Sequence, residues 1–240
     1  MHCSELARPT PPPHLCELTR WLRRGLVGIF CVLAFITPSL AVAQTSAPLP
    51  GTPRTVVILG DSLAAGYGVD SSEAFPALLQ QKVAAAGLPF KIVSAGVSGD
   101  TTAGGLRRLD WVLKRPVDVL LIELGGNDGL RGLAPEATRT NLQQIIDKTR
   151  AQRPGTRFII AGMQLPPNLG EDYIRQFERV FPEVAKANGA ALIPQLLAGV
   201  GGDPKLNLPD RIHPTPAGHQ LVAATVWKVL RPVLEEAAKR

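Results

Sequence analysis

Short apolar runs alternate with longer segments of helical periodicity along most of this chain. The runs are bounded by glycine, proline or polar residues and have the length of strands buried in a parallel sheet. The expected strands are Thr55–Gly60, Lys91–Ala95, Val117–Leu124, Arg157–Ala161 and Ala190–Pro194. The run at 117–124 is the most hydrophobic, so we expect it to lie near the centre of the sheet.

The segments between these runs repeat apolar residues at spacings of three and four, which is typical of amphipathic helices. The expected helices are Phe75–Ala86, Thr101–Lys114, Pro135–Gln152, Tyr173–Asn188 and Thr215–Ala238. We expect the last helix to be interrupted at Pro232, because proline lacks the amide hydrogen that a helix interior uses.

The strand–helix alternation predicts the fold. Parallel strands are joined by right-handed crossovers, so a repeated βα order places helices on both faces of one sheet. We therefore expect one three-layer α/β/α domain with a five-stranded parallel sheet, similar to flavodoxin-like folds. Functional residues in such domains lie at the carboxyl ends of the strands.

The N-terminal segment has the pattern of an export signal. A basic stretch at 20–24 precedes an apolar run at 25–36, and Pro38 and the small residues at 41–43 follow. Signal peptidase cleaves after such small residues, so we expect cleavage after Ala43. An uncleaved anchor is the alternative, because 25–43 could almost cross a bilayer of about 30 Å.

The chain is thus expected to have three parts: leader and signal at 1–43, a linker rich in Ser, Pro and Thr at 44–54, and a domain at 55–240. All three cysteines (Cys3, Cys16 and Cys31) precede the expected cleavage point. The exported protein is therefore expected to have no disulfide and no thiolate chemistry. His213 and His219 are the histidines that remain for catalysis.

Charge and composition argue against a nucleic-acid partner. The net charge is +6, and removing 1–43, with four arginines against two glutamates, lowers it to +4. No run of five basic residues remains in the rest, and aromatic residues make up only 5% of the chain. Basic runs or stacking aromatics would be expected of a nucleic-acid binder.

Three strand ends carry polar residues that could face a common crevice. The first strand ends in Gly60-Asp61-Ser62-Leu63, where Ser62 would project its hydroxyl, although Asp61 or Ser62 could merely cap a turn. The second leads into Gly96-Val97-Ser98-Gly99, which could expose a backbone N–H. The third leads into Gly125-Gly126-Asn127-Asp128, where flanking glycines allow close approach of a ligand to Asn127.

A carboxylate and an imidazole stand three residues apart just before the last helix, at Asp210 and His213. One turn of chain can bring the Asp oxygen onto His Nδ1, which leaves Nε2 free as a base. His219 lies within the expected helix with no acid three or four residues before it. We interpret it as a packing or surface histidine.

These four blocks together resemble the SGNH, or GDSL-type, hydrolase family, which is named for a Ser, a Gly, an Asn and a His in separate blocks. Ser62, Gly99, Asn127 and the pair Asp210 and His213 match the blocks in the expected order. The resemblance runs from about Thr55 to the C-terminus. It is closest to the periplasmic bacterial group with thioesterase, arylesterase and lysophospholipase activities, through the runs 58–66, 123–132 and 165–168.

The resemblance implies a serine hydrolase that cleaves esters or thioesters through an acyl-enzyme. It implies Ser62 as nucleophile, with Asp210 and His213 as the other triad members. The oxyanion hole would consist of the N–H groups of Ser62 and Gly99 and the amide of Asn127. No metal or organic cofactor is expected.

The predicted acyl pocket combines two loops. The predicted substrate-binding residues are Asp128, Gly129, Leu130, Leu133, Leu165 and Pro166. The apolar side chains of Leu130, Leu133 and Leu165 favour aryl esters and medium acyl chains over sugar acetates. The alternative enzyme is a carbohydrate or peptidoglycan O-acetylesterase, and the alternative from another class is a binding module on the same sheet. Neither GxxxxGK[ST] nor GxGxxG is present to support that module.

The expected partner is a small ester or thioester. We expect a periplasmic or secreted monomer with no stable membrane anchor after cleavage.

Overall fold

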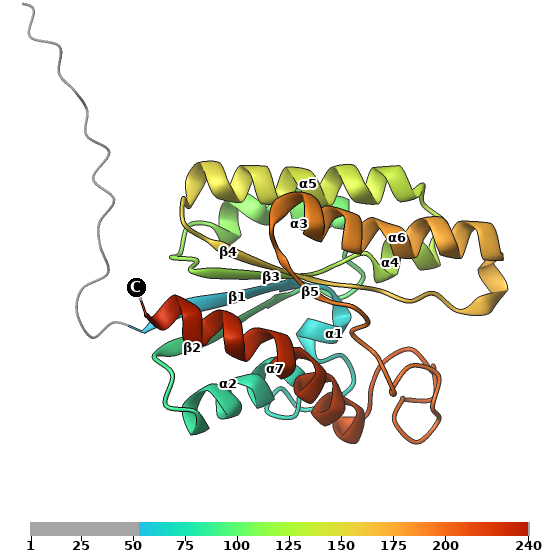
Figure 1. The fold of residues 1–240 in the computed structure, drawn as a ribbon. Helices are drawn as coiled ribbons and strands as arrows, with labels where there is room; N and C mark the ends of the chain where they lie inside the picture. The colour runs from blue at the N-terminus through green and yellow to red at the C-terminus, as the bar shows by residue number, and fades with distance from the viewer. Residues whose placement is uncertain (1–52, 240) are drawn as a thin grey trace, which may run out of the picture. The chain divides into compact units, whose positions relative to one another are not determined.

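A five-stranded parallel sheet forms the centre of the domain in the computed structural model, which describes residues 53–239 (Figure 1). The strands are β1 (Arg54–Gly60), β2 (Phe90–Gly96), β3 (Val119–Glu123), β4 (Arg157–Ala161) and β5 (Ala191–Ile193). Their order across the sheet is β2-β1-β3-β4-β5, so β3 is the central strand as predicted. From β1 the chain first adds β2 on one side and then adds β3, β4 and β5 on the other. The direction of the strand order therefore reverses between β1 and β3, and their carboxyl ends form a topological switch point.

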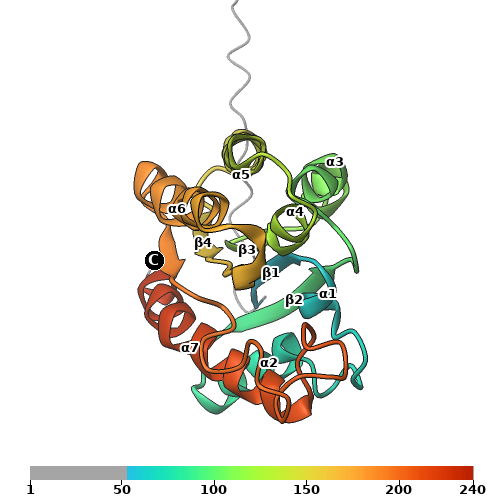
Figure 2. The same cartoon turned by 90° about the vertical axis from the view of Figure 1, so that its right-hand side faces the viewer.

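Helices cover both faces of this sheet, so the predicted three-layer α/β/α fold is confirmed (Figure 2). The long helices are α2 (Phe75–Ala85), α3 (Thr102–Val112), α5 (Pro135–Gln152), α6 (Glu171–Asn188) and α7 (Pro216–Ala238). One face is covered by α3, α5 and α6, and the other by α2 and α7. Figure 2 faces the carboxyl ends of the strands, the edge where a site is expected.

Three short helical segments were not predicted: α1 (Ser62–Ala65), α4 (Gly126–Leu130) and the 3₁₀ turn η1 (Pro167–Leu169). The first follows β1 after one residue and the second follows β3 after two. Each has only a single helical turn, too short to show apolar periodicity. They place Ser62 and Asn127 at the carboxyl edge.

Burial explains why the apolar runs form strands. Residues 56–59 of β1 and all of β3 are fully buried, so both faces of these strands contact core side chains. A strand enclosed in this way has a continuous apolar sequence instead of alternating polar and apolar positions. The one ionisable residue in β3 is Glu123, which is as buried as its neighbours.

The predicted interruption at Pro232 is wrong, because α7 continues through it to Ala238. Leu230 and Leu234, on either side of the proline, are both fully buried in the core. Burial of each such side chain stabilises the helix by about 2 kcal/mol, which offsets the hydrogen bond that proline removes.

The predicted signal, cleavage point and most of the linker lie outside the described residues. Within 53–239, no helix combines the length and apolar character needed to cross a membrane.

Candidate active site

Ser62, Asp210 and His213 form a chain of two hydrogen bonds at the carboxyl edge of the sheet. His213 Nε2 lies 2.8 Å from Ser62 Oγ, although the two residues are 151 positions apart. His213 Nδ1 lies 2.7 Å from Asp210 Oδ2. A serine next to an imidazole that is oriented by a carboxylate is the arrangement of a nucleophile with its general base.

The turn that carries Ser62 is tightly fixed. Asp61 caps α1 by accepting a 3.0 Å hydrogen bond from the Leu63 N–H, and Gly66 ends the helix in the left-handed region at φ +73°. Gly60 allows the Glu123 side chain to approach the backbone of this turn, since a Cβ at position 60 would lie 2.3 Å from Glu123 Oε2. Ser62 itself is only 9% exposed, so its hydroxyl is held at the rim of the core.

The loop that carries Asp210 and His213 is fixed by its own backbone. Asp210 Oδ1 accepts hydrogen bonds from the N–H groups of Ile212 and His213, at 2.9 and 3.0 Å. Partial burial raises the pKa of Asp210, but these bonds and the imidazole outweigh it and lower the pKa to about 2. Asp210 is therefore ionised at neutral pH, as a group that stabilises an imidazolium must be. Arg211 makes the turn at φ +60°.

Asn207 holds this loop from inside. Its side chain is buried, and its amide donates to the carbonyls of Val200 and Asp203. Asn207 also forms a β-bridge with Pro214, directly after His213. Asn207 thus links the segment beside His213 to the residues at 200–203, in addition to the backbone bond from Leu208 N–H to the His213 carbonyl.

The three predicted oxyanion donors come from three different strand ends. Ser62 follows β1, Gly99 follows β2 at φ +80°, and Asn127 lies in α4 after β3. Within residues 53–239, the N–H groups of Ser62 and Gly99 have no protein acceptor, so both are available to a ligand.

The third donor is already engaged. Asn127 Nδ2 donates to Asp61 Oδ2 at 3.1 Å and to the Asp100 carbonyl at 2.9 Å. It can serve an oxyanion only by sharing one of these hydrogens or releasing one of these bonds.

Two arginines contact the loops after β1, β2 and β3 from the side. Arg108, on α3, donates to the Gly60 carbonyl at 2.9 Å and pairs with Asp100 at 2.6 Å. Arg131, after α4, donates to the Gly99 carbonyl at 2.9 Å. The loops after β1, β2 and β3 are therefore linked to one another by side chains that the sequence analysis did not single out.

Residues 58–221 match the GDSL-like lipase/acylhydrolase family. The chain belongs to this family. It is therefore a hydrolase that acts on ester bonds, and the predicted family resemblance is confirmed.

Named relatives agree with this assignment. The chain is 43% identical to Esterase TesA of Pseudomonas aeruginosa over 182 residues, which cover 75% of this chain and 90% of that protein. It is 37% identical to Thioesterase 1/protease 1/lysophospholipase L1 of Escherichia coli over 181 residues, covering 75% and 85%. An Arylesterase of Vibrio mimicus is 34% identical over 176 residues, covering 73% and 87%.

Solved structures show the same fold. The crystal structure of TesA matches with a TM-score of 0.71 at 43% identity, covering 75% of this chain and 99% of that one. The esterase EstA from Pseudoalteromonas sp., in a form inhibited by monoethylphosphonate, matches with a TM-score of 0.71 at 32% identity, covering 76% and 99%. AlinE4, an SGNH-hydrolase family esterase, matches with a TM-score of 0.63 at 40% identity, covering 75% and 97%.

The structure does not support Asp128 as a substrate-binding residue of this acylhydrolase. Its side chain is 1% exposed and accepts hydrogen bonds from the backbone N–H and the hydroxyl of Thr102. Thr138 adds a third donor at 3.4 Å. Asp128 links the start of α3 to α4, and its carboxylate is buried in the interior.

The other predicted substrate-binding residues divide into two groups. Leu165 is buried and packs over Gly129, where a Cβ would lie 2.3 Å from the leucine side chain. Leu130, Leu133 and Pro166 are exposed. Leu165 and Gly129 leave no open space between them, and we call this contact the floor of the predicted acyl pocket. The three exposed residues offer apolar surface beside this floor.

Two aromatic contacts involve the histidines. The centroid of the exposed Tyr67 ring lies 4.5 Å from that of the His213 ring, and the two planes are tilted by 43°. His219 is 1% exposed and stacks on Phe75, whose backbone N–H donates to its Nδ1 at 3.2 Å. Burial lowers the pKa of His219 to about 4, helped by the charge of His213. His219 is a neutral packing residue.

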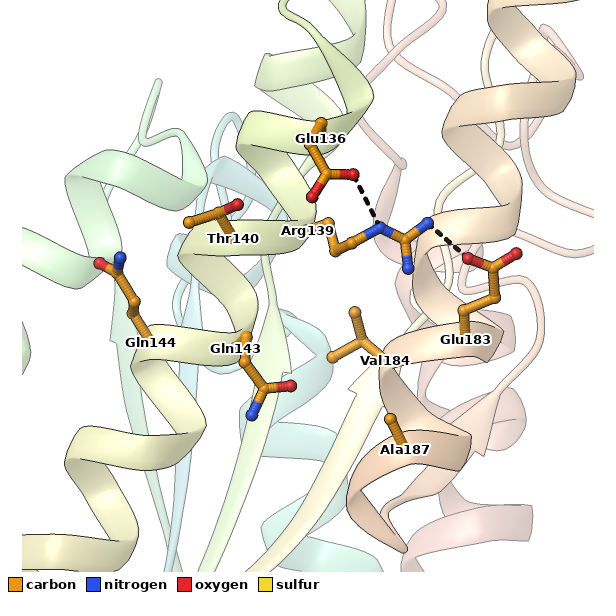
Figure 3. Close-up of a pocket in the computed structure, with 8 residues that line it drawn as sticks. All are labelled: Glu136, Arg139, Thr140, Gln143, Gln144, Glu183, Val184 and Ala187. Atoms are coloured by element: carbon orange, nitrogen blue, oxygen red, sulfur yellow. Dashed lines mark hydrogen bonds and ion pairs between the residues drawn. The ribbon is translucent and has the colours of Figure 1, made fainter.

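A cavity of about 330 Å³ lies away from the triad, between α5 and α6 (Figure 3). Figure 3 shows Arg139 of α5 extending toward α6, paired with Glu183 there and with Glu136 on its own helix. The residues that line it include no serine, cysteine or histidine, unlike the triad at the carboxyl edge.

Proposed function

We propose that this acylhydrolase cleaves carboxylic esters and thioesters through an acyl-enzyme on Ser62. The hydrogen-bonded chain from Ser62 through His213 to Asp210 carries this proposal. His213 Nε2 takes the Ser62 proton as Oγ attacks the substrate carbonyl carbon, and Asp210 stabilises the imidazolium. His213 then protonates the leaving alkoxide or thiolate as its bond to carbon breaks. Water, deprotonated by His213, then attacks the acyl-enzyme carbonyl, and His213 returns that proton to Ser62 Oγ as its bond to the acyl carbon breaks and the carboxylic acid leaves.

The oxyanion of each tetrahedral intermediate would accept hydrogen bonds from Ser62 N–H, Gly99 N–H and Asn127 Nδ2. One such donor is worth about 3 kcal/mol of transition-state stabilisation. The unused N–H groups support the first two assignments. The third requires Asn127 to share a hydrogen now held by Asp61 or Asp100.

The proposed substrates carry aryl groups or linear acyl chains of medium length, with lysophospholipids as candidates. The exposed Leu130, Leu133 and Pro166 would line the acyl chain, above the floor formed by Gly129 and Leu165. The relatives are named as an esterase, a thioesterase and lysophospholipase, and an arylesterase, and these names support this class.

We also propose that the protein is exported and acts in the periplasm or outside the cell as a monomer. The basic stretch, the apolar run and the small residues ending at Ala43 support a cleaved signal. Expression of the full chain in a Gram-negative host would test it. The mass of the exported protein should correspond to cleavage after Ala43, whereas an intact, membrane-associated chain would show an anchor.

A chain-length series tests the catalytic proposal. The exported protein is assayed on p-nitrophenyl esters from acetate to palmitate, beside Ser62→Ala. We expect a maximum at medium chains and a loss of at least about 10³-fold in the variant. Activity confined to acetate would replace the substrate class with O-acetyl esters, and full activity of Ser62→Ala would overturn the mechanism.

A further inference from the structure

Glu123, the last residue of β3, lies directly beneath the turn that carries Ser62. Its side chain is fully buried, and Oε2 accepts hydrogen bonds from the N–H groups of Asp61 at 3.1 Å and Ala64 at 3.2 Å. These two N–H groups flank Ser62 in the chain. A side chain from the central strand therefore fixes both sides of the nucleophile.

The second oxygen of Glu123 has a different environment. Oε1 is buried and has no donor among the described residues. An ionised carboxylate would leave that oxygen uncompensated in the core, which is costly. A protonated carboxyl carries an O–H group that needs only an acceptor.

The candidate acceptor is the carboxyl of Asp61, whose own N–H is bound to Glu123 Oε2 and whose pKa and that of Glu123 each depend on the other group. Burial, and then the charge of Asp61, raise the pKa of Glu123 well above its ordinary value. Burial raises the pKa of Asp61 to about 6, against hydrogen bonds from Leu63 and Asn127 and the charge of His213. Two buried carboxyls in contact cannot both be ionised at low cost, so one keeps its proton.

We propose that Glu123 is a positioning residue that stays protonated, accepts the Asp61 and Ala64 N–H groups through Oε2, and donates its own proton to the Asp61 carboxylate. Its importance for activity rests on the proposed role of Ser62. Arg108, which donates to the Gly60 carbonyl next to this turn, is paired with Asp100.

The shared proton has consequences beyond the turn. Asp61 Oδ1 caps α1 at Leu63, and Oδ2 holds the Asn127 amide. Fixing Asp61 therefore orients both the nucleophile and the proposed third oxyanion donor. A displacement of about 1 Å at either group can lower the rate about a hundredfold.

The test compares a neutral isostere with a residue that removes all the hydrogen bonds. In Glu123→Gln, Oε1 of the glutamine can accept both N–H groups and Nε2 can donate to Asp61. Glu123→Met keeps the volume and offers no strong partner. On p-nitrophenyl butyrate we expect Glu123→Gln to stay within about threefold of the wild-type kcat. We expect Glu123→Met to lose about tenfold to a hundredfold in kcat, with KM changed less than about twofold.

Infrared spectroscopy provides a readout that does not depend on activity. At pH 7 the wild-type protein should show the carbonyl stretch of a protonated carboxyl, and Glu123→Gln should lack it. This measurement, with the kcat of Glu123→Gln, decides the proposal even if Glu123→Met does not fold.

Three results would overturn the proposal: loss of kcat in Glu123→Gln as large as in Glu123→Met, full activity of folded Glu123→Met, or no protonated carboxyl band in the wild type. A failure of the proposed function looks different. In that case Ser62→Ala would retain full ester hydrolysis, while the infrared band at Glu123 would be unaffected.

Discussion

The two halves of the candidate triad are held in opposite ways. Ser62 follows a buried strand, and its turn is fixed from the interior by Glu123 and from the side by Arg108. Asp210 and His213 lie on a partly exposed loop, which is fixed by local backbone bonds and by Asn207. The nucleophile is thus part of the core, whereas the base belongs to a segment with less burial. Such segments open at lower free energy than the core does.

This contrast predicts that Asp210 can be altered with little effect on stability but a large effect on catalysis. Asp210→Asn removes the charge that holds the imidazole in its orientation and stabilises its protonated form. We expect kcat to fall about 10³-fold or more, with a melting temperature within a few degrees of wild type. Steady-state kinetics and thermal unfolding measure both.

Asp70→Asn is the matched control. Like Asp210, Asp70 accepts a hydrogen bond from the backbone N–H of the residue two positions later, here Ser72. This turn is exposed and contains no histidine. We expect it to leave kcat unchanged. An equal loss of kcat in Asp210→Asn and Asp70→Asn would mean that Asp210 only stabilises its turn and does not act on the imidazole.

A substitution at Asn207 should weaken the anchoring of the loop that carries Asp210 and His213 while leaving most of the catalysis intact. Asn207→Ala removes one buried and one partly buried hydrogen bond and should destabilise the fold by about 1–3 kcal/mol. Because the loop can still close on the nucleophile, we expect kcat to fall only severalfold. Urea unfolding and kcat at 25 °C test this pair of effects.

Asn188→Ala provides the comparison on the far side of the domain. Asn188 likewise donates two amide hydrogen bonds, to Gln143 and Val184, at the end of α6. It should lower stability without lowering kcat. If both variants lowered kcat equally, the loss in Asn207→Ala would reflect stability alone.

The smallest effect concerns His219, which should influence stability only in acid. Its pKa is about 4 in the folded protein and about 6.5 when unfolded, so the unfolded chain binds more protons between these values. Stability is therefore lost as the pH falls from about 6.5 toward 4. His219→Asn keeps an acceptor for the Phe75 N–H and does not titrate.

We expect the difference in unfolding free energy between wild type and His219→Asn to vary with pH in that window and to be constant above it. Denaturant unfolding at a series of pH values measures it. A difference independent of pH would contradict a neutral buried imidazole.

The sequence predicted the fold well where burial is continuous. The bounds of α5 and β4 were predicted as observed, because proline, glycine and apolar periodicity mark their ends. It failed at Pro232, where packing on both sides overrides a local preference. The single-turn helices α1 and α4 were missed because their form depends on the sheet beneath them.

The site shows the same division between local and long-range information. The contact of Asp210 with His213 spans three residues and could be anticipated from spacing. The burial of Asp128 depends on Thr102 and Thr138, which are distant in sequence. A glutamate ending the most hydrophobic strand was a visible signal for Glu123. Its partners, Asp61 and Ala64, are set by the parallel pairing of β1 with β3.

The most direct test of the central claim is to trap the nucleophile. The wild-type protein and Ser62→Ala are treated with a fluorophosphonate, which phosphonylates an activated serine, and are mapped by peptide mass spectrometry. We predict one adduct, on Ser62, that appears in step with loss of ester hydrolysis and is absent from the variant. An adduct on another residue, or hydrolysis that persists with Ser62 fully modified, would contradict the account.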